Sequence, residues 1–160
     1  MTTICLQING ATVADDLPPR MSIADFLRER RNLNGTHLGC EHGICGACTI
    51  LVDGEPARSC LMLAVACDER EIRTIEGFAG DRVIDALRRN FHQHHALQCG
   101  YCTPAMLITA RDLILRRRAG SETEIREGLA GNICRCTGYT NIVTAIAEAA
   151  KELGREAANA

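Results

Sequence analysis

Eight of the ten cysteines in this 160-residue chain fall into two groups of four. The first group has the spacing C-x4-C-x2-C-x11-C, and the second has the spacing C-x2-C-x31-C-x-C. Because no secretory signal is visible in the sequence, we expect these thiols to bind metal rather than to form disulfides. The first group is Cys40, Cys45, Cys48 and Cys60, and the second is Cys99, Cys102, Cys134 and Cys136.

The first group has the ligand spacing of a plant-type [2Fe–2S] cluster, with a fourth cysteine that follows sooner than in plant ferredoxins. A cluster held by four thiolates is an anion, and backbone N–H groups stabilise its sulfurs. Glycine lets the backbone approach closely and adopt a positive φ. Gly39, Gly43 and Gly46 stand where such turns are needed. We therefore predict a [2Fe–2S] site whose ligands are the four cysteines of the first group.

The second group is placed at two predicted helix starts. Its first pair directly precedes a helix that we expect to begin with Thr103 as its cap and Pro104 as its first residue. Its second pair lies in GNICRCTGYTN, just before the last predicted helix. Helix N-termini offer free N–H groups and a positive dipole end, which favour thiolates. The second group therefore predicts another [2Fe–2S] site.

Two other interpretations remain open from the residues alone. Zinc also takes four thiolates, so a zinc-stabilised interaction module is an alternative. Its usual pattern pairs two C-x2-C knuckles, which a three-cysteine loop and a C-x-C pair fit poorly. A free two-cluster ferredoxin shuttle is the other alternative, and a net charge of −2 argues weakly against the acidic docking face of such a shuttle.

Two cysteines belong to neither group. Cys5 lies between apolar residues of a predicted strand, and Cys67 follows an apolar run. We expect both to be small buried side chains rather than ligands.

The composition excludes several classes of protein. Acidic and basic residues are interspersed, so there is no basic face for nucleic acid. No stretch approaches the roughly 20 apolar residues that span a membrane. We see no nucleophile–base pair and no phosphate-binding loop, so we expect no catalytic residues in this chain. These observations favour a cytoplasmic protein without membrane insertion.

The chain changes its pattern near Gly77 to Asp81. The first half predicts short strands, a hairpin turn at Asp53-Gly54 and a short helix capped by Ser22. The predicted strands are residues 3–8, 11–17, 49–52, 56–59 and 71–77. This half, residues 1–78, predicts a β-grasp domain of the plant-type ferredoxin kind.

The second half, residues 79–160, predicts a four-helix bundle, which makes the fold class α+β. Apolar periodicity predicts helices around residues 83–91, 103–114 and 142–153, and Ser121 with Glu124 predicts a capping box for another. We expect Gly154 to end the last helix and the tail after it to be disordered.

Three motifs carry a resemblance to a known family. GCEHGICGACTILVDG, LQCGYCTPAM and GNICRCTGYTNIV resemble the signatures of the small, two-cluster iron–sulfur subunit of the molybdenum hydroxylases, the xanthine oxidase family. The resemblance extends from about Thr3 to Leu153. In general appearance, the sequence is most similar to the small subunits of the aerobic carbon monoxide dehydrogenase type.

The resemblance implies an electron-transfer subunit of an oxidoreductase. Substrate, such as an N-heterocycle, an aldehyde or carbon monoxide, would be oxidised at molybdopterin, in its cytosine dinucleotide form, in a large subunit. Single electrons would pass to the second cysteine group, then to the first, and then to FAD in a medium subunit. The implied assembly is a dimer of heterotrimers.

The resemblance also implies two contacts with the molybdenum cofactor. The residue before C-x2-C and the last cysteine of C-x-C lie near the pterin in this family. In this sequence they are Gln98 and Cys136. The amide of Gln98 has groups that can donate to and accept from a pterin edge.

Overall fold

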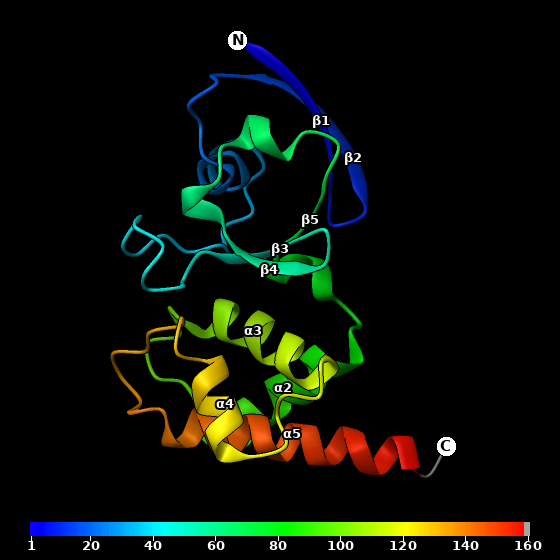
Figure 1. The fold of residues 1–160 in the computed structure, drawn as a ribbon, viewed down its shortest axis with the longest axis vertical. Helices are drawn as coiled ribbons and strands as arrows, with labels where there is room; N and C mark the ends of the chain where they lie inside the picture. The colour runs from blue at the N-terminus through cyan, green and yellow to red at the C-terminus, as the bar shows by residue number, and fades with distance from the viewer. Residues whose placement is uncertain (159–160) are drawn as a thin grey trace.

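The computed structural model describes residues 1–158, which form a strand-rich part followed by a helical part (Figure 1). Each part has its own hydrophobic core. The fold class is therefore α+β, as predicted.

The strand-rich part contains one mixed sheet in the order β2-β1-β5-β3-β4. β1 and β5 are parallel, whereas the β1–β2, β3–β4 and β3–β5 pairs are antiparallel. The strands are β1 (Thr2–Ile8), β2 (Ala11–Leu17), β3 (Thr49–Val52), β4 (Glu55–Arg58) and β5 (Glu71–Arg73).

Alternation along β1 corrects the expectation for Cys5. Ile4, Leu6 and Ile8 point into the core, so Cys5 lies on the opposite face and is exposed. Cys67 is buried, as expected.

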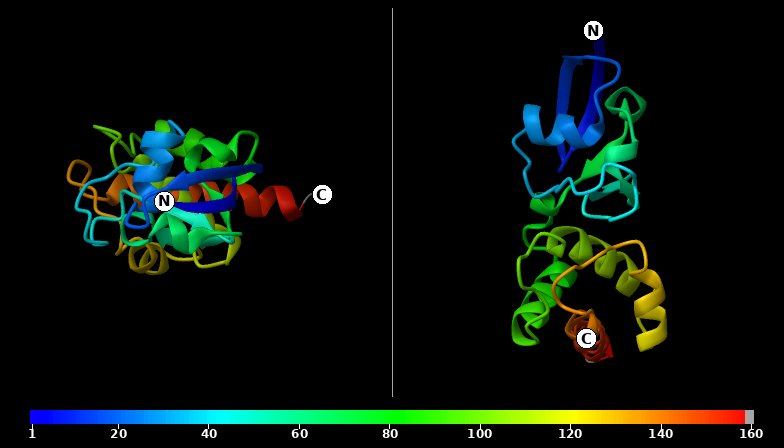
Figure 2. Two further views of the ribbon diagram at one scale, coloured as in Figure 1. Left: turned by 90° about the horizontal axis from the view of Figure 1, so that it is seen from above. Right: turned by 90° about the vertical axis from the view of Figure 1, so that its left-hand side faces the viewer.

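A short helix, α1 (Ile23–Asp25), continues as a π-helical turn (Phe26–Arg30) and buries its apolar residues in the first core. Ser22 caps it, because its hydroxyl accepts from the N–H of Asp25 at 3.0 Å. The right-hand view of Figure 2 shows this helix beside the sheet. The cap predicted from the sequence is confirmed.

The predicted strand over residues 71–77 is shorter in the structure. β5 ends at Arg73, and the chain then forms a 3-10 turn (Ile75–Phe78). The side chain of Asn9 accepts from the N–H of Thr74 at 2.9 Å, which replaces a strand partner there. Two further 3-10 turns cover Ser59–Leu61 and Ala64–Cys67.

Four helices build the second core. α3 also contacts β3 and β4, so it lies directly against the strand-rich part (Figure 1). The helices are α2 (Arg82–Gln93), α3 (Thr103–Leu115), α4 (Glu122–Gly128) and α5 (Thr140–Ala158).

The helix ends test three predictions. The capping box of Ser121 and Glu124 is present. The expected cap of α3 is shifted, because Cys102 occupies the cap position and Thr103 is the first helical residue. Gly154 does not end the last helix, since a glycine costs only about 1 kcal/mol inside a helix. The expected disordered tail is therefore wrong up to Ala158, and Asn159 and Ala160 lie outside the described residues.

The segment between the two parts is held by charged contacts. Phe78 packs into the helical core, with the guanidinium groups of Arg73 and Arg111 at 4.2 Å and 4.9 Å from its ring centre. Asp81 accepts from the N–H groups of Val83 and Ile84 in the first turn of α2 and forms an ion pair of 2.9 Å with Arg111. These contacts fix the start of α2 against α3. Within the described residues, none of the helices is long and apolar enough to cross a membrane.

Candidate metal centres

The loop that carries the first cysteines curls around the Cys40 thiol. Glu41, Gly43 and Gly46 all have positive φ, at 55°, 74° and 73°. This curl directs the N–H groups of His42 and Cys45 at Cys40 Sγ, each at 3.3 Å. These two hydrogen bonds lower the pKa of Cys40 to about 6, and the bond from Cys45 contributes more than the bond from His42. The loop thus stabilises a thiolate without a basic side chain.

The hairpin of β3 and β4 returns the fourth cysteine to this loop. Asp53 and Gly54 form its turn with φ of 50° and 83°, as the Asp-Gly pair predicts. Ser59 then hydrogen-bonds the carbonyl of Cys48 through its N–H and its hydroxyl, which places Cys60 beside Cys48. The gap of eleven residues between these cysteines is therefore the length of one hairpin.

The first four thiols meet in two pairs, Cys40 with Cys45 and Cys48 with Cys60. Burial, together with the neighbouring Cys48, raises the pKa of Cys60 to about 11. A positive centre is needed to ionise such a thiol at neutral pH.

The second group is also arranged in pairs. Cys99 Sγ and Cys136 Sγ are 3.4 Å apart, and Cys102 meets Cys134. The N–H of Tyr101 and the thiol of Cys136 lower the pKa of Cys99. Burial, with Cys134 nearby, raises the pKa of Cys102 to about 12. Residues from the start of α3 and from the loop before α5 thus converge, as the sequence predicted.

Two hydroxyl side chains that the sequence analysis missed support Cys134. Burial opposes its ionisation, but hydrogen bonds led by the Thr137 hydroxyl, at 3.0 Å, outweigh burial and lower its pKa. The Tyr139 hydroxyl accepts from the N–H of Cys134 at 2.9 Å. Both residues stand within five positions of Cys134, which was the available signal.

The thiol pairs fit [2Fe–2S] clusters. Each iron of such a cluster takes two protein thiolates, whereas a structural zinc needs four ligands around one ion. Next to Cys102, the hydroxyl of Thr103 is buried, and it has no hydrogen-bond partner among residues 1–158.

The loops of the two sites lie on the same side of the molecule in Figures 1 and 2. The N–H of Ile133 donates to the carbonyl of Cys45 at 2.8 Å. A methyl group added to Gly46 would lie 2.2 Å from the carbonyl oxygen of Gly131, so the two backbones are in contact there. The sites are therefore adjacent, and their loops touch through the backbone.

An aromatic pair joins the loops at a second point. The rings of His37 and Tyr101 stack with centres 4.5 Å apart. The Tyr101 hydroxyl donates to the carbonyl of Leu38 at 2.7 Å, and its own carbonyl lies 2.7 Å from His37 Nδ1. These contacts link the stretch before Cys40 to the stretch between Cys99 and Cys102.

The second site opens to the surface at its first cysteine. Gln98 and Cys99 are exposed, and Cys136 is half-buried. Leu97 and Tyr101 beside them are 40% and 48% exposed. This edge carries both residues that the sequence analysis assigned to a cofactor in a partner.

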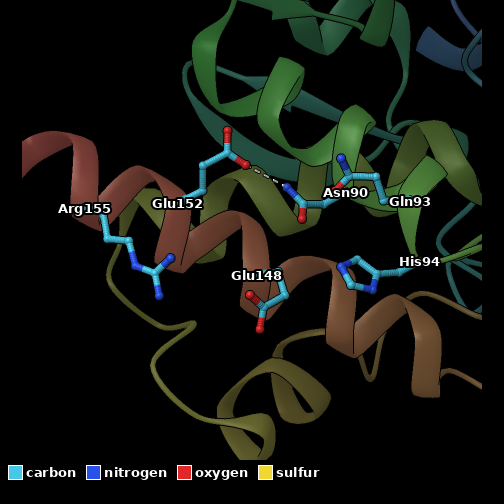
Figure 3. Close-up of a pocket in the computed structure, with 6 residues that line it drawn as sticks. All are labelled: Asn90, Gln93, His94, Glu148, Glu152 and Arg155. Atoms are coloured by element: carbon cyan, nitrogen blue, oxygen red, sulfur yellow. Dashed lines mark hydrogen bonds between the residues drawn. The ribbon is translucent and has the colours of Figure 1, made fainter.

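A polar depression lies between α2 and α5 (Figure 3). The amide of Asn90 donates to Glu152 at 2.9 Å along its wall. No cysteine lines it. Its residues are Asn90, Gln93, His94, Glu148, Glu152 and Arg155.

Comparisons with known proteins agree with two cluster-binding parts. Residues 6–71 match the family described as "2Fe-2S iron-sulfur cluster binding domain", and residues 74–147 match the "[2Fe-2S] binding domain". The chain is 53% identical over 146 residues to caffeine dehydrogenase subunit gamma from Pseudomonas sp. (strain CBB1), with 89% of this chain and 87% of that protein covered.

Two further relatives extend the comparison. The xanthine dehydrogenase iron-sulfur-binding subunit of Escherichia coli O157:H7 is 40% identical, covering 93% of this chain and 94% of its own. The crystal structure of quinoline 2-oxidoreductase from Pseudomonas putida 86 contains a chain that is 48% identical, with a TM-score of 0.89. Coverage is 97% of this chain and 96% of that one.

These similarities extend over nearly the whole chain and include both cysteine sites. This chain belongs to the iron–sulfur subunits of the xanthine dehydrogenase-type molybdenum hydroxylases, and it transfers electrons within an oxidoreductase complex.

Proposed function

We propose that this chain relays single electrons from a molybdopterin centre in a large subunit to FAD in a medium subunit. The entry point is the site of Cys99, Cys102, Cys134 and Cys136, and the exit is the site of Cys40, Cys45, Cys48 and Cys60. The proposal rests on the hydrogen bond of 2.8 Å from the N–H of Ile133 to the carbonyl of Cys45, which joins the loops of the two sites directly.

We assign the eight cysteines as ligands of two [2Fe–2S] clusters. A bound cluster of this type accepts and releases one electron at a time. The protein supplies hydrogen bonds to the sulfurs, and these bonds raise the potential of a cluster by stabilising its reduced, more negative form. The N–H groups of His42, Cys45 and Tyr101 fill this role.

Gln98 and Cys136 are proposed to contact the pterin. Support comes from the exposure of Gln98 next to Cys99 and from the contact between Cys99 and Cys136. An exposed amide beside a cluster ligand can meet a cofactor that a partner subunit carries. The cytosine dinucleotide form of the cofactor is part of the proposal.

The domain division is also proposed. Residues 1–78 would form a β-grasp domain, and residues 79–160 would form a four-helix bundle. Support comes from the two separate cores, although the side chain of Phe78 packs into the second core. The proposed boundary, between residues 78 and 79, follows the 3-10 turn that ends at Phe78.

The assembly would be a dimer of heterotrimers in the cytoplasm. The large subunit would hydroxylate an N-heterocycle, because the relatives named above act by name on caffeine, xanthine and quinoline.

Purification of the tagged chain from its native host tests the proposed assembly. Molybdenum and flavin subunits should co-elute with it, and a chain that elutes alone would support a free ferredoxin shuttle instead.

A further inference from the structure

The side chain of Asn132 lies between the two candidate cluster sites. It is 3% exposed and stands two positions before Cys134. Its amide nitrogen donates to the carbonyl of Gly46 at 3.2 Å and to the Thr49 hydroxyl at 3.4 Å. Gly46 stands two positions before Cys48, and Thr49, the first residue of β3, directly follows it. A residue of one site is thus anchored on the loop of the other.

The opposite end of the same amide is held by α3. The Thr109 hydroxyl donates to Asn132 Oδ1 at 3.0 Å, and Thr109 is itself 9% exposed. The N-terminal end of α3 carries Cys102. The amide therefore connects the first loop, the second loop and α3, with both of its polar atoms engaged.

Arg58 completes this interloop network, which we define as Thr49, Arg58, Thr109 and Asn132. One guanidinium nitrogen donates to the carbonyl of Gly131 at 2.6 Å, and the other donates to the Thr49 hydroxyl. Thr49 in turn donates to the carbonyl of Gly46 at 2.6 Å. A buried network in which every polar group has a hydrogen-bond partner makes its surroundings rigid. Removing one group leaves its partners buried without a hydrogen bond.

We propose that Asn132 is a positioning residue for electron transfer: its buried amide, bonded to Gly46, Thr49 and Thr109, holds the two clusters at a fixed separation. The inference rests on the cluster assignment under the proposed function. Both the rate of electron exchange and the magnetic interaction between two centres depend steeply on their separation. A network that fixes the loops therefore sets both quantities.

Two substitutions weaken the network at different points in the purified complex. Asn132→Asp has the same shape but replaces the donor nitrogen with an oxygen that faces the Gly46 carbonyl. Thr109→Val removes the hydroxyl at nearly constant volume, and Thr109→Ser is its matched control because it keeps the hydroxyl. Iron content and the g-values of each cluster establish that the individual sites are intact.

The measurement is the magnetic splitting between the two clusters in the EPR spectrum of the fully reduced complex. We expect Asn132→Asp and Thr109→Val to change the splitting beyond the spread of repeat preparations, and Thr109→Ser to retain it. A role in stability alone would lower the melting temperature and leave the splitting unmoved. Wild-type splitting in both Asn132→Asp and Thr109→Val would overturn the inference.

Two other outcomes are also decisive. If Asn132→Asp does not assemble, the Thr109 pair decides, because an equal change in Thr109→Val and Thr109→Ser assigns the effect to packing and overturns the inference. Failure of the cluster assignment is seen separately, because the unmodified complex would then lack one of the two EPR signals.

Discussion

The N–H of Ile133 donates to the carbonyl oxygen of Cys45 at 2.8 Å, and this bond joins the loops of the two candidate cluster sites. Ile133 precedes Cys134 in the second site, and Cys45 belongs to the first. The route between the sites is therefore short and made of backbone. Beside this contact, Gly46 packs against the backbone of Gly131 and leaves no room for a larger side chain at position 46.

Gly46→Ala tests this close packing. The added methyl group would lie 2.2 Å from the Gly131 carbonyl, at a residue whose φ is 73°. The positive φ alone costs roughly 1–2 kcal/mol, and the clash adds to it because backbone has to move. We expect a lower melting temperature and an altered EPR interaction between the clusters.

Gly54→Ala is the matched control for this change. Gly54 also has a positive φ, 83°, but an added methyl group would meet nothing within 4 Å. The Gly54→Ala variant should lose only the stability that a positive φ costs a non-glycine residue, and its EPR spectra should be unchanged. Equal effects of the two substitutions would remove the argument for close backbone approach.

Cys136→Ser should abolish the signal of the second cluster and stop electron delivery to the acceptor. The first cluster should persist, because its four thiols come from another part of the chain with its own core. EPR of the reduced complex measures both signals. Cys5→Ser is the control, since Cys5 is exposed on β1 and lies outside both groups. Loss of both signals in Cys136→Ser contradicts two separately formed sites.

Gln98→Leu should slow reduction of the clusters by substrate while leaving both EPR signals intact. Losing one hydrogen bond of about 1.4 kcal/mol to a reacting cofactor corresponds to roughly tenfold in rate. Stopped-flow absorbance with the co-purified enzyme and its substrate measures this step. Gln93→Leu, an exposed change on α2, should leave the rate unchanged. An unaltered rate in Gln98→Leu would remove Gln98 from the proposed pterin contact.

Asp81 should make stability depend on pH. Burial opposes its ionisation, but hydrogen bonds from Arg111 and from the N–H of Ile84 outweigh burial, so its pKa is lowered. Its contribution is therefore complete above the unfolded pKa of about 3.9 and is lost as the pH falls towards the lower folded pKa. Asp81→Ala should cost about 1–2 kcal/mol at pH 7 through the lost helix cap.

Chemical denaturation of the full chain at several pH values measures this difference. The gap in unfolding free energy between wild type and Asp81→Ala should stay nearly constant from about pH 7 to about pH 5, and it should narrow as the pH falls below about 4. Asp85→Ala provides the comparison, since Asp85 forms an exposed pair of 3.6 Å with Arg88 and should have a small effect. A gap that widens at low pH would contradict the assigned direction.

Local sequence patterns predicted much of the fold and of the candidate ligands. The short cysteine motifs C-x4-C-x2-C, C-x2-C and C-x-C, the Asp53-Gly54 turn and the caps at Ser22 and Ser121 all depend on residues close in the chain. Those features could be predicted because short-range geometry decides them.

Contacts between distant segments could not be predicted in this way. Asn132 meets Gly46 across 86 positions, and Tyr101 meets Leu38 across 63. Gly154 misled the prediction, because good helix formers on both sides outweigh the cost of a single glycine. Cys5 misled it because apolar neighbours on a strand point to the face opposite its own.

Metal and sulfide analysis of the purified chain in its complex, combined with EPR after reduction, tests the central claim most directly. The account predicts iron and acid-labile sulfide in equal amounts, about four of each per chain, with two distinguishable [2Fe–2S] signals. Zinc in place of iron, with no visible absorbance, or a single cluster signal would contradict it.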